Sequence, residues 1–61
     1  MICKVKYCRL GEEEKETYAI NIPESTVRSL NGKAMEEYII DKLQESLGVP
    51  VFLYYWMFSY N

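Results

Sequence analysis

The stretch VFLYYWMFSY, residues 51–60, decides how this chain must fold. Its β-branched and aromatic residues favour a β-strand, in which side chains alternate between two faces. One predicted face is aromatic and consists of Phe52, Tyr54, Trp56, Phe58 and Tyr60. The other is mostly aliphatic and consists of Val51, Leu53, Tyr55, Met57 and Ser59. A strand that is apolar on both faces needs a cover on both faces.

The chain is short for that task. With 61 residues it forms one small domain, 1–61, and a domain of this size buries only about 60% of the surface of its unfolded chain. The composition is that of a globular protein, with 49% hydrophobic and 26% charged residues. Small domains usually add a disulfide, a metal or a partner chain to complete the core.

Disulfide and metal stabilisation are not expected. Cys3 and Cys8 would point to opposite faces of one strand, roughly 17 Å apart along it, which is too far for a bridge. The N-terminus has no apolar run of signal length, so we expect a reducing, cytoplasmic environment. The apolar tail is too short for a membrane-spanning helix. We therefore expect the chain to complete its core by association with a partner chain.

The N-terminal third predicts an antiparallel hairpin. Residues 2–10 and 17–22 alternate as strands, the charged stretch 11–16 forms the connecting loop, and Pro23 ends the second strand. We expect one face of the hairpin to point inward, with the apolar residues Cys3, Val5, Tyr7, Tyr18, Ile20 and Ile22.

Residues 33–47 predict an amphipathic helix that ends at Gly48 and Pro50. Its apolar stripe consists of Met35, Ile39, Leu43 and Leu47, flanked by Tyr38. Residues 23–30 are ambiguous: they can form one or two helical turns, and Asn31 can serve as the N-cap of the main helix.

The elements predict an α+β fold, a two-layer ββαβ unit with one helix on a three-stranded sheet. We prefer the wholly antiparallel spatial order 2-1-3 over the order 1-2-3, which contains one parallel pair. The aliphatic face of residues 51–60 fits beneath the helix more easily than the aromatic face, which is the alternative. Either choice leaves an apolar surface and an unguarded edge strand.

No catalytic function is expected. The chain has no histidine, no glycine-rich phosphate loop and no cysteine pair with metal-ligand spacing. Its carboxylates fall in the loop or on the solvated helix face rather than in a cleft. We therefore expect no enzyme activity, cofactor or metal.

The prediction that remains is binding. We expect a homodimer or higher oligomer, built face to face or edge to edge through the aromatic set. The residues predicted for self-association are Phe52, Tyr54, Trp56, Phe58 and Tyr60. A protein partner of unknown identity is expected to dock on the outer helix face, at Glu36, Glu37, Asp41, Gln44 and Glu45. Small non-catalytic chains of this kind include inhibitors and regulators, such as phage proteins that block host enzymes.

Two other partners are less favoured. The net charge of −2 and pI near 5.0 argue against a dedicated nucleic-acid binder, although they allow a local basic patch. Lys4 and Lys6 beside aromatic residues make a single-stranded nucleic-acid platform the alternative function. Membrane attachment is not expected, because residues 49–61 contain no lysine or arginine.

Overall fold

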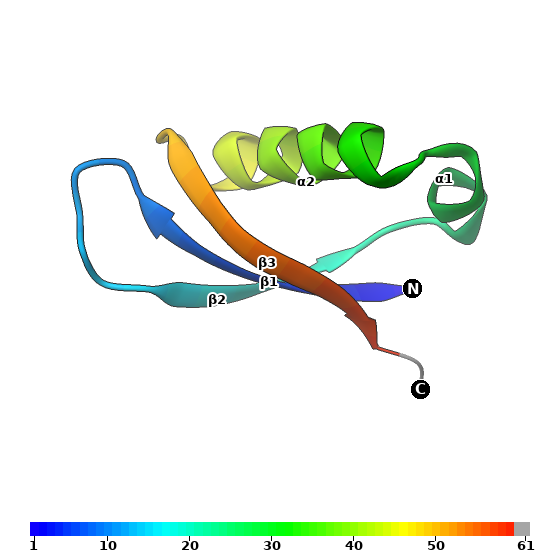
Figure 1. Cartoon of the computed structure of the whole chain (residues 1–61), viewed down its shortest axis with the longest axis horizontal. Helices are drawn as coiled ribbons and strands as arrows, with labels where there is room; N and C mark the ends of the chain where they lie inside the picture. The colour runs from blue at the N-terminus through cyan, green and yellow to red at the C-terminus, as the bar shows by residue number, and fades with distance from the viewer. Residues whose placement is uncertain (60–61) are drawn as a thin grey trace.

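The computed structural model describes residues 1–59 and contains three strands and two helices. In chain order these are β1 (Ile2–Arg9), β2 (Glu16–Asn21), α1 (Glu24–Ser29), α2 (Gly32–Leu47) and β3 (Val51–Ser59). Figure 1 shows α2 lying over one face of the sheet. The sheet has the order β2-β1-β3 and both pairings are antiparallel, which confirms the predicted α+β fold and the preferred strand order.

Both ends of α2 follow from local chemistry. The side chain of Asn31 accepts a hydrogen bond from the backbone N–H of Ala34 at 3.2 Å, so Asn31 is the N-cap. Gly48 follows the last helical residue in the left-handed conformation, with φ of 73°, where a side chain would be strained. The ambiguous stretch before Asn31 forms the short helix α1, whose Glu24 and Arg28 make an ion pair at 2.6 Å.

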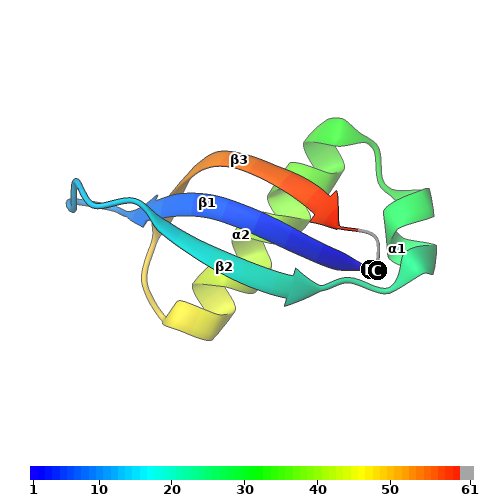
Figure 2. The same ribbon diagram turned by 90° about the horizontal axis from the view of Figure 1, so that it is seen from below.

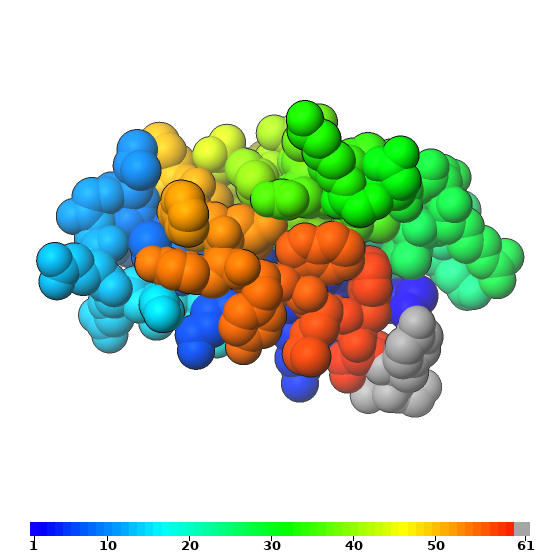
Figure 3. All heavy atoms as spheres, in the orientation of Figure 1, coloured from blue at the N-terminus to red at the C-terminus, as the bar shows by residue number. Residues whose placement is uncertain are grey.

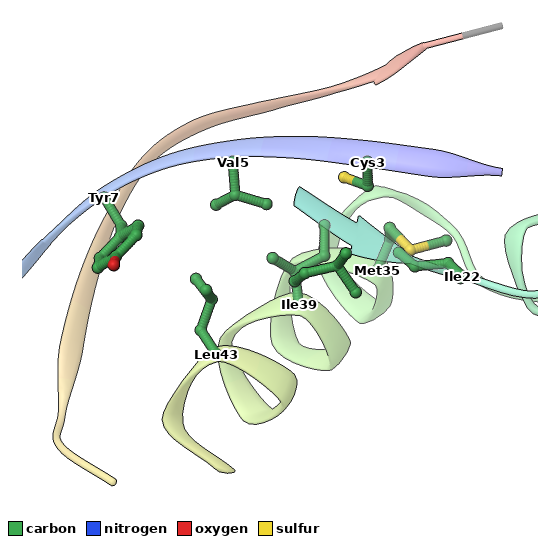
Figure 4. Close-up of a cluster of buried hydrophobic side chains, with 8 residues drawn as sticks. Cys3, Val5, Tyr7, Ile22, Met35, Ile39 and Leu43 are labelled. Atoms are coloured by element: carbon green, nitrogen blue, oxygen red, sulfur yellow. The ribbon is translucent and has the colours of Figure 1, made fainter. Parts of the chain in front are cut away.

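The core lies between α2 and the sheet, and the central strand β1 contributes most of the sheet side. Figure 4 shows Cys3, Val5 and Tyr7 pointing toward Met35, Ile39 and Leu43 of α2. The predicted stripe is confirmed, since these three helix residues are buried and Leu47 and Tyr38 pack at its margin. The fully enclosed apolar residues are Cys3, Val5, Ile22, Ile39 and Leu43.

The predicted alternation of residues 51–60 is wrong at one point, because β3 contains a β-bulge. Lys6 lies opposite Tyr55 whereas Tyr7 lies opposite Leu53, so β3 has one residue more than β1 at this position. The bulge exchanges the two faces along the strand. The residues that pack on the core therefore come from both predicted sets and are Val51, Leu53, Trp56 and Phe58.

Side-chain volume explains why neither uniform face points inward. The small inward residues Cys3 and Val5 lie opposite Phe58 and Trp56, respectively. Tyr7, which is large, lies opposite Leu53. Each inward pair thus combines one small and one large side chain, which fills the space beneath α2 evenly. A uniform aromatic face would place a second aromatic ring beside Tyr7, and a uniform aliphatic face would place Met57 in place of Phe58 opposite Cys3 and leave Trp56 on the outer face.

Candidate interaction surface

The outer strand β3 presents an unpaired backbone edge. It is the longest strand, with nine residues against six in β2 at the opposite edge, and it pairs only with β1. Between Val51 and Ser59 there is no proline, lysine or other charged residue to discourage pairing with another strand. Figure 3 shows the β3 side chains, orange to red, lying across the front of the molecule with no other segment over them.

The face of the sheet away from α2, here called the open face, carries the exposed apolar residues of β3. Phe52, Tyr55 and Met57 are more than half exposed, at 56%, 55% and 55%, and Tyr54 is 45% exposed. These four side chains lie along one strand, and Figure 2 shows that α2 lies behind the sheet in this view. An apolar row of this kind is typical of an interaction site.

The five residues predicted for self-association do not share one environment in the structure. Phe52 and Tyr54 are exposed, Trp56 and Phe58 are half-buried against the core, and Tyr60 lies outside the described residues. Two residues that the sequence assigned to the other face, Tyr55 and Met57, join the exposed set. The misplaced residues all follow from the bulge, which strict period-two alternation does not predict.

Lysines occupy the middle of the open face. Lys4 lies between Ala19 of β2 and Met57 of β3 in the ladder, and Lys6 lies between Thr17 and Tyr55. Since directly paired residues share a face, each ammonium group stands between a small side chain and a large one. Lys6 and Tyr55 are therefore neighbours on this face, whereas Lys4 lies beside the apolar Met57.

A small cluster closes one end of the open face. The Cys8 thiol donates a hydrogen bond to the Tyr54 hydroxyl at 3.8 Å, and Cys8 is only 7% exposed. The Lys15 ammonium lies 4.6 Å from the centre of the Tyr54 ring, and the Phe52 ring meets that of Tyr54 edge-on at 5.3 Å. The neighbouring Cys8 sulfur raises the pKa of the Tyr54 phenol, because the neutral phenol can hydrogen-bond to it, and desolvation raises this pKa further.

The charged residues of the open face differ from those of α2. Three lysines, Lys4, Lys6 and Lys15, lie on or over the open face, and none of the described strand residues on that face is acidic. The carboxylates predicted for docking, on Glu36, Glu37, Asp41 and Glu45, are exposed on α2. The strand residues of the open face are therefore basic and aromatic although the net charge of the chain is negative, and the acidic residues Glu12, Glu13 and Glu14 lie in the loop that carries Lys15.

Gln44 differs from the other predicted docking residues. It is half-buried, and its side-chain oxygen lies 3.5 Å from the backbone N–H of Val51, at the start of β3. This contact connects the last turn of α2 to the strand that follows it. Gln44 therefore has a structural role in the fold.

The described residues contain neither a candidate metal cluster nor a membrane-spanning helix, and their two cysteines are free. Within residues 1–59 no group of three or more Cys, Asp or Glu side chains is placed to hold a metal ion. Both cysteines are free and buried, and burial raises the pKa of the Cys3 thiol, with a smaller opposing effect from the backbone of Met57. No helix among these residues is long and apolar enough to cross a membrane.

No protein-family model, curated protein or solved structure matches this chain.

Proposed function

We propose that this chain is a non-catalytic binding protein that self-associates through β3 and regulates another protein by contact. The observation that carries the proposal is the β3 edge, which is long, unguarded and bordered by the exposed residues Phe52, Tyr54, Tyr55 and Met57. An unpaired edge of this kind is a template for a further strand, and a second copy of the chain supplies an identical one.

Charge on the open face favours edge pairing over face-to-face packing. Two open faces pressed together would bring Lys4, Lys6 and Lys15 of each copy into one interface without a strand carboxylate to neutralise them. Edge pairing of two β3 strands avoids this cost. It produces a six-stranded antiparallel sheet with two-fold symmetry, in which the exposed aromatic rows of the two copies become neighbours on the same face.

A second copy also supplies the buried surface that this small chain lacks. A stable protein interface buries about 800 Å² per partner, which is nearly a fifth of the 4373 Å² accessible surface of the monomer. The dimer partly buries the exposed apolar row of β3, which contains Phe52, Tyr55 and Met57. The free energy of association then adds to the marginal stability expected of 61 residues.

Sedimentation velocity over a concentration series tests the self-association. We expect the wild-type chain to sediment as a dimer at micromolar concentration. The double variant Phe52→Glu/Met57→Glu should sediment as a folded monomer, because like charges would lie opposite each other across the paired strands. The control Thr17→Glu/Ala19→Glu adds the same charge at exposed positions of β2, at the opposite edge of the sheet, and should remain a dimer. A wild-type chain that stays monomeric over the whole series contradicts the proposal.

The regulatory half of the proposal concerns a protein partner. Exposed carboxylates on Glu36, Glu37 and Asp41 of α2 face away from the sheet, so dimerisation through β3 leaves them free to meet a basic surface. The test compares the wild-type chain with a Glu36→Lys/Asp41→Lys variant in affinity capture followed by mass spectrometry. A protein that the wild type retains and the variant loses supports the proposal; identical captures contradict docking at α2.

A further inference from the structure

The open face combines two features that single-stranded nucleic acids require of a binding surface. Lys4 and Lys6 project from the central strand, and Lys15 lies over Tyr54 at the end of the face. Beside them stand exposed aromatic rings, of which Phe52 and Tyr55 are more than half exposed. We infer that the open face binds single-stranded DNA or RNA, a function beyond the protein contacts proposed above.

The lysines suit a phosphate backbone. Lys4 and Lys6 are two residues apart on one strand, so their side chains leave the same face about 7 Å apart. This spacing is comparable to that of successive phosphates in an extended strand. Thr17 and Ala19, their neighbours on β2, are small and exposed, so a backbone can lie across β1 without steric obstruction. No acidic strand residue lies on the described part of this face, which lowers the repulsion that the net charge of −2 would suggest; the acidic residues nearest to it in sequence are Glu12, Glu13 and Glu14, in the loop that carries Lys15.

The aromatic residues suit the bases. Tyr55 lies opposite Lys6, which places a stacking ring directly beside a phosphate-binding group. The ring of Tyr54 is already held by Lys15 and Phe52, so its role is to fix that end of the surface. A flat sheet face presents such rings to unpaired bases, whereas bases within a duplex are stacked on one another and not available to it.

The same features favour nucleic acid over an acidic protein segment. An acidic peptide would satisfy the lysines, but it offers no planar groups for Tyr55 and Phe52. A single strand offers an anionic group and a planar base in every nucleotide, which matches the pairing of Lys6 with Tyr55 across β1 and β3. Edge pairing of β3 would leave this face uncovered and double its length, although binding to the face of one chain does not require the dimer.

Fluorescence anisotropy with labelled oligothymidylate and oligouridylate of about twelve nucleotides tests the inference. We expect saturable binding whose logarithm of affinity falls with the logarithm of salt concentration with a slope near −2, as three lysine–phosphate contacts predict. Lys4→Glu/Lys6→Glu should weaken binding at least tenfold, and Lys33→Glu/Lys42→Glu, which changes the same charge on α2, should leave it unchanged within about twofold. If the charge-reversed variant does not fold, Lys4→Gln/Lys6→Gln replaces it.

The aromatic contribution is measured separately. Tyr55→Ser should weaken binding about five- to hundredfold, the range expected for loss of one stacked base, while Val49→Ser, at an exposed apolar residue between α2 and β3, should have no effect. No binding by the wild type, or equal losses in the α2 control, overturns the inference. Equally tight, Tyr55-independent binding of a polyglutamate peptide also overturns it and assigns the face to an acidic protein. Sedimentation of each variant shows whether the β3 dimer persists, so failure of nucleic-acid binding is distinguished from failure of self-association.

Discussion

Lys6 of β1 lies opposite Tyr55 of β3, one residue later than the pairing of Tyr7 with Leu53 requires. Tyr54 is the additional residue, and its insertion turns the second half of β3 over relative to the first. The result is an inner face that fits the small and large side chains of β1 in turn. The same displacement places Tyr54 and Tyr55 together on the outside, next to Cys8 and Lys6.

Deleting Tyr54 should therefore be tolerated. Without it, Leu53 points inward, Tyr55 outward, Trp56 inward, Met57 outward and Phe58 inward, which is regular alternation. We expect the deletion to lower the free energy of unfolding by only about 1 kcal/mol, because it removes one surface residue and its contacts with Cys8 and Lys15. Urea denaturation followed by circular dichroism measures the change.

Deletion of Met57 is the matched control. It places Phe58 directly after Trp56, so the two aromatic rings cannot both point inward. The free energy of unfolding should then fall by about 3 kcal/mol or more, as for loss of a large core side chain. Equal effects of the two deletions would contradict the assigned bulge position.

Trp56 and Phe52 should differ in what their removal costs. Trp56 packs on the core opposite Val5, so Trp56→Ala should lower the free energy of unfolding by about 3 kcal/mol. Phe52 is 56% exposed, so Phe52→Ala should cost less than about 1 kcal/mol. Chemical denaturation at a concentration below dimerisation measures both values. A large loss of stability for Phe52→Ala and a small one for Trp56→Ala would contradict the assignment of Trp56 to the inner face of β3 and of Phe52 to the outer face.

Tyr54 should protect Cys8 from reagents. The thiol of Cys8 lies on the open face but is only 7% exposed, and the Tyr54 hydroxyl is 3.8 Å from its sulfur. Tyr54→Ala should make alkylation of Cys8 by iodoacetamide about tenfold faster, whereas Tyr55→Ala should leave the rate unchanged. Peptide mass spectrometry identifies the modified cysteine. Labelling of Cys3 before Cys8 would be inconsistent with the enclosed position of Cys3.

Stability should decrease in mildly alkaline solution because of Cys3. Burial raises the pKa of this thiol in the folded chain, whereas the unfolded thiol ionises at about its ordinary value of 8.5. Below that pH the thiol is neutral in both states; above it the unfolded state loses its proton first, so the free energy of unfolding falls until the folded pKa is passed. The slope approaches about 1.4 kcal/mol per pH unit, and Cys3→Ala should remove this contribution from urea titrations. Identical slopes for the two proteins would contradict it.

Much of the fold follows from sequence pattern. The stripe of Met35, Ile39 and Leu43, the cap at Asn31 and the stop at Gly48 each act locally, and all three are confirmed. A single helix can return the chain to either edge of the hairpin, so two strand orders are possible. The preference for antiparallel pairing selects the observed order β2-β1-β3.

The face of β3 could not be predicted in the same way. Residues 51–59 are apolar at almost every position, so no polar residue fixes the register and either face is compatible with burial. The bulge depends on the volumes of Cys3, Val5 and Tyr7 on another strand. These tertiary contacts cannot be read from the pattern of residues 51–59 alone. As a consequence Trp56 and Phe58, predicted for self-association, instead pack on the core, while Tyr55 and Met57 are exposed.

Amide hydrogen exchange tests the central claim, pairing of two β3 strands at their edges, most directly. Exchange is followed by NMR at one concentration below the dissociation constant and one well above it. We predict that the amides of β3 that point away from β1 gain protection at the higher concentration, while the edge amides of β2 do not change. Protection that is independent of concentration, or that increases along β2 and not along β3, would contradict the proposed association.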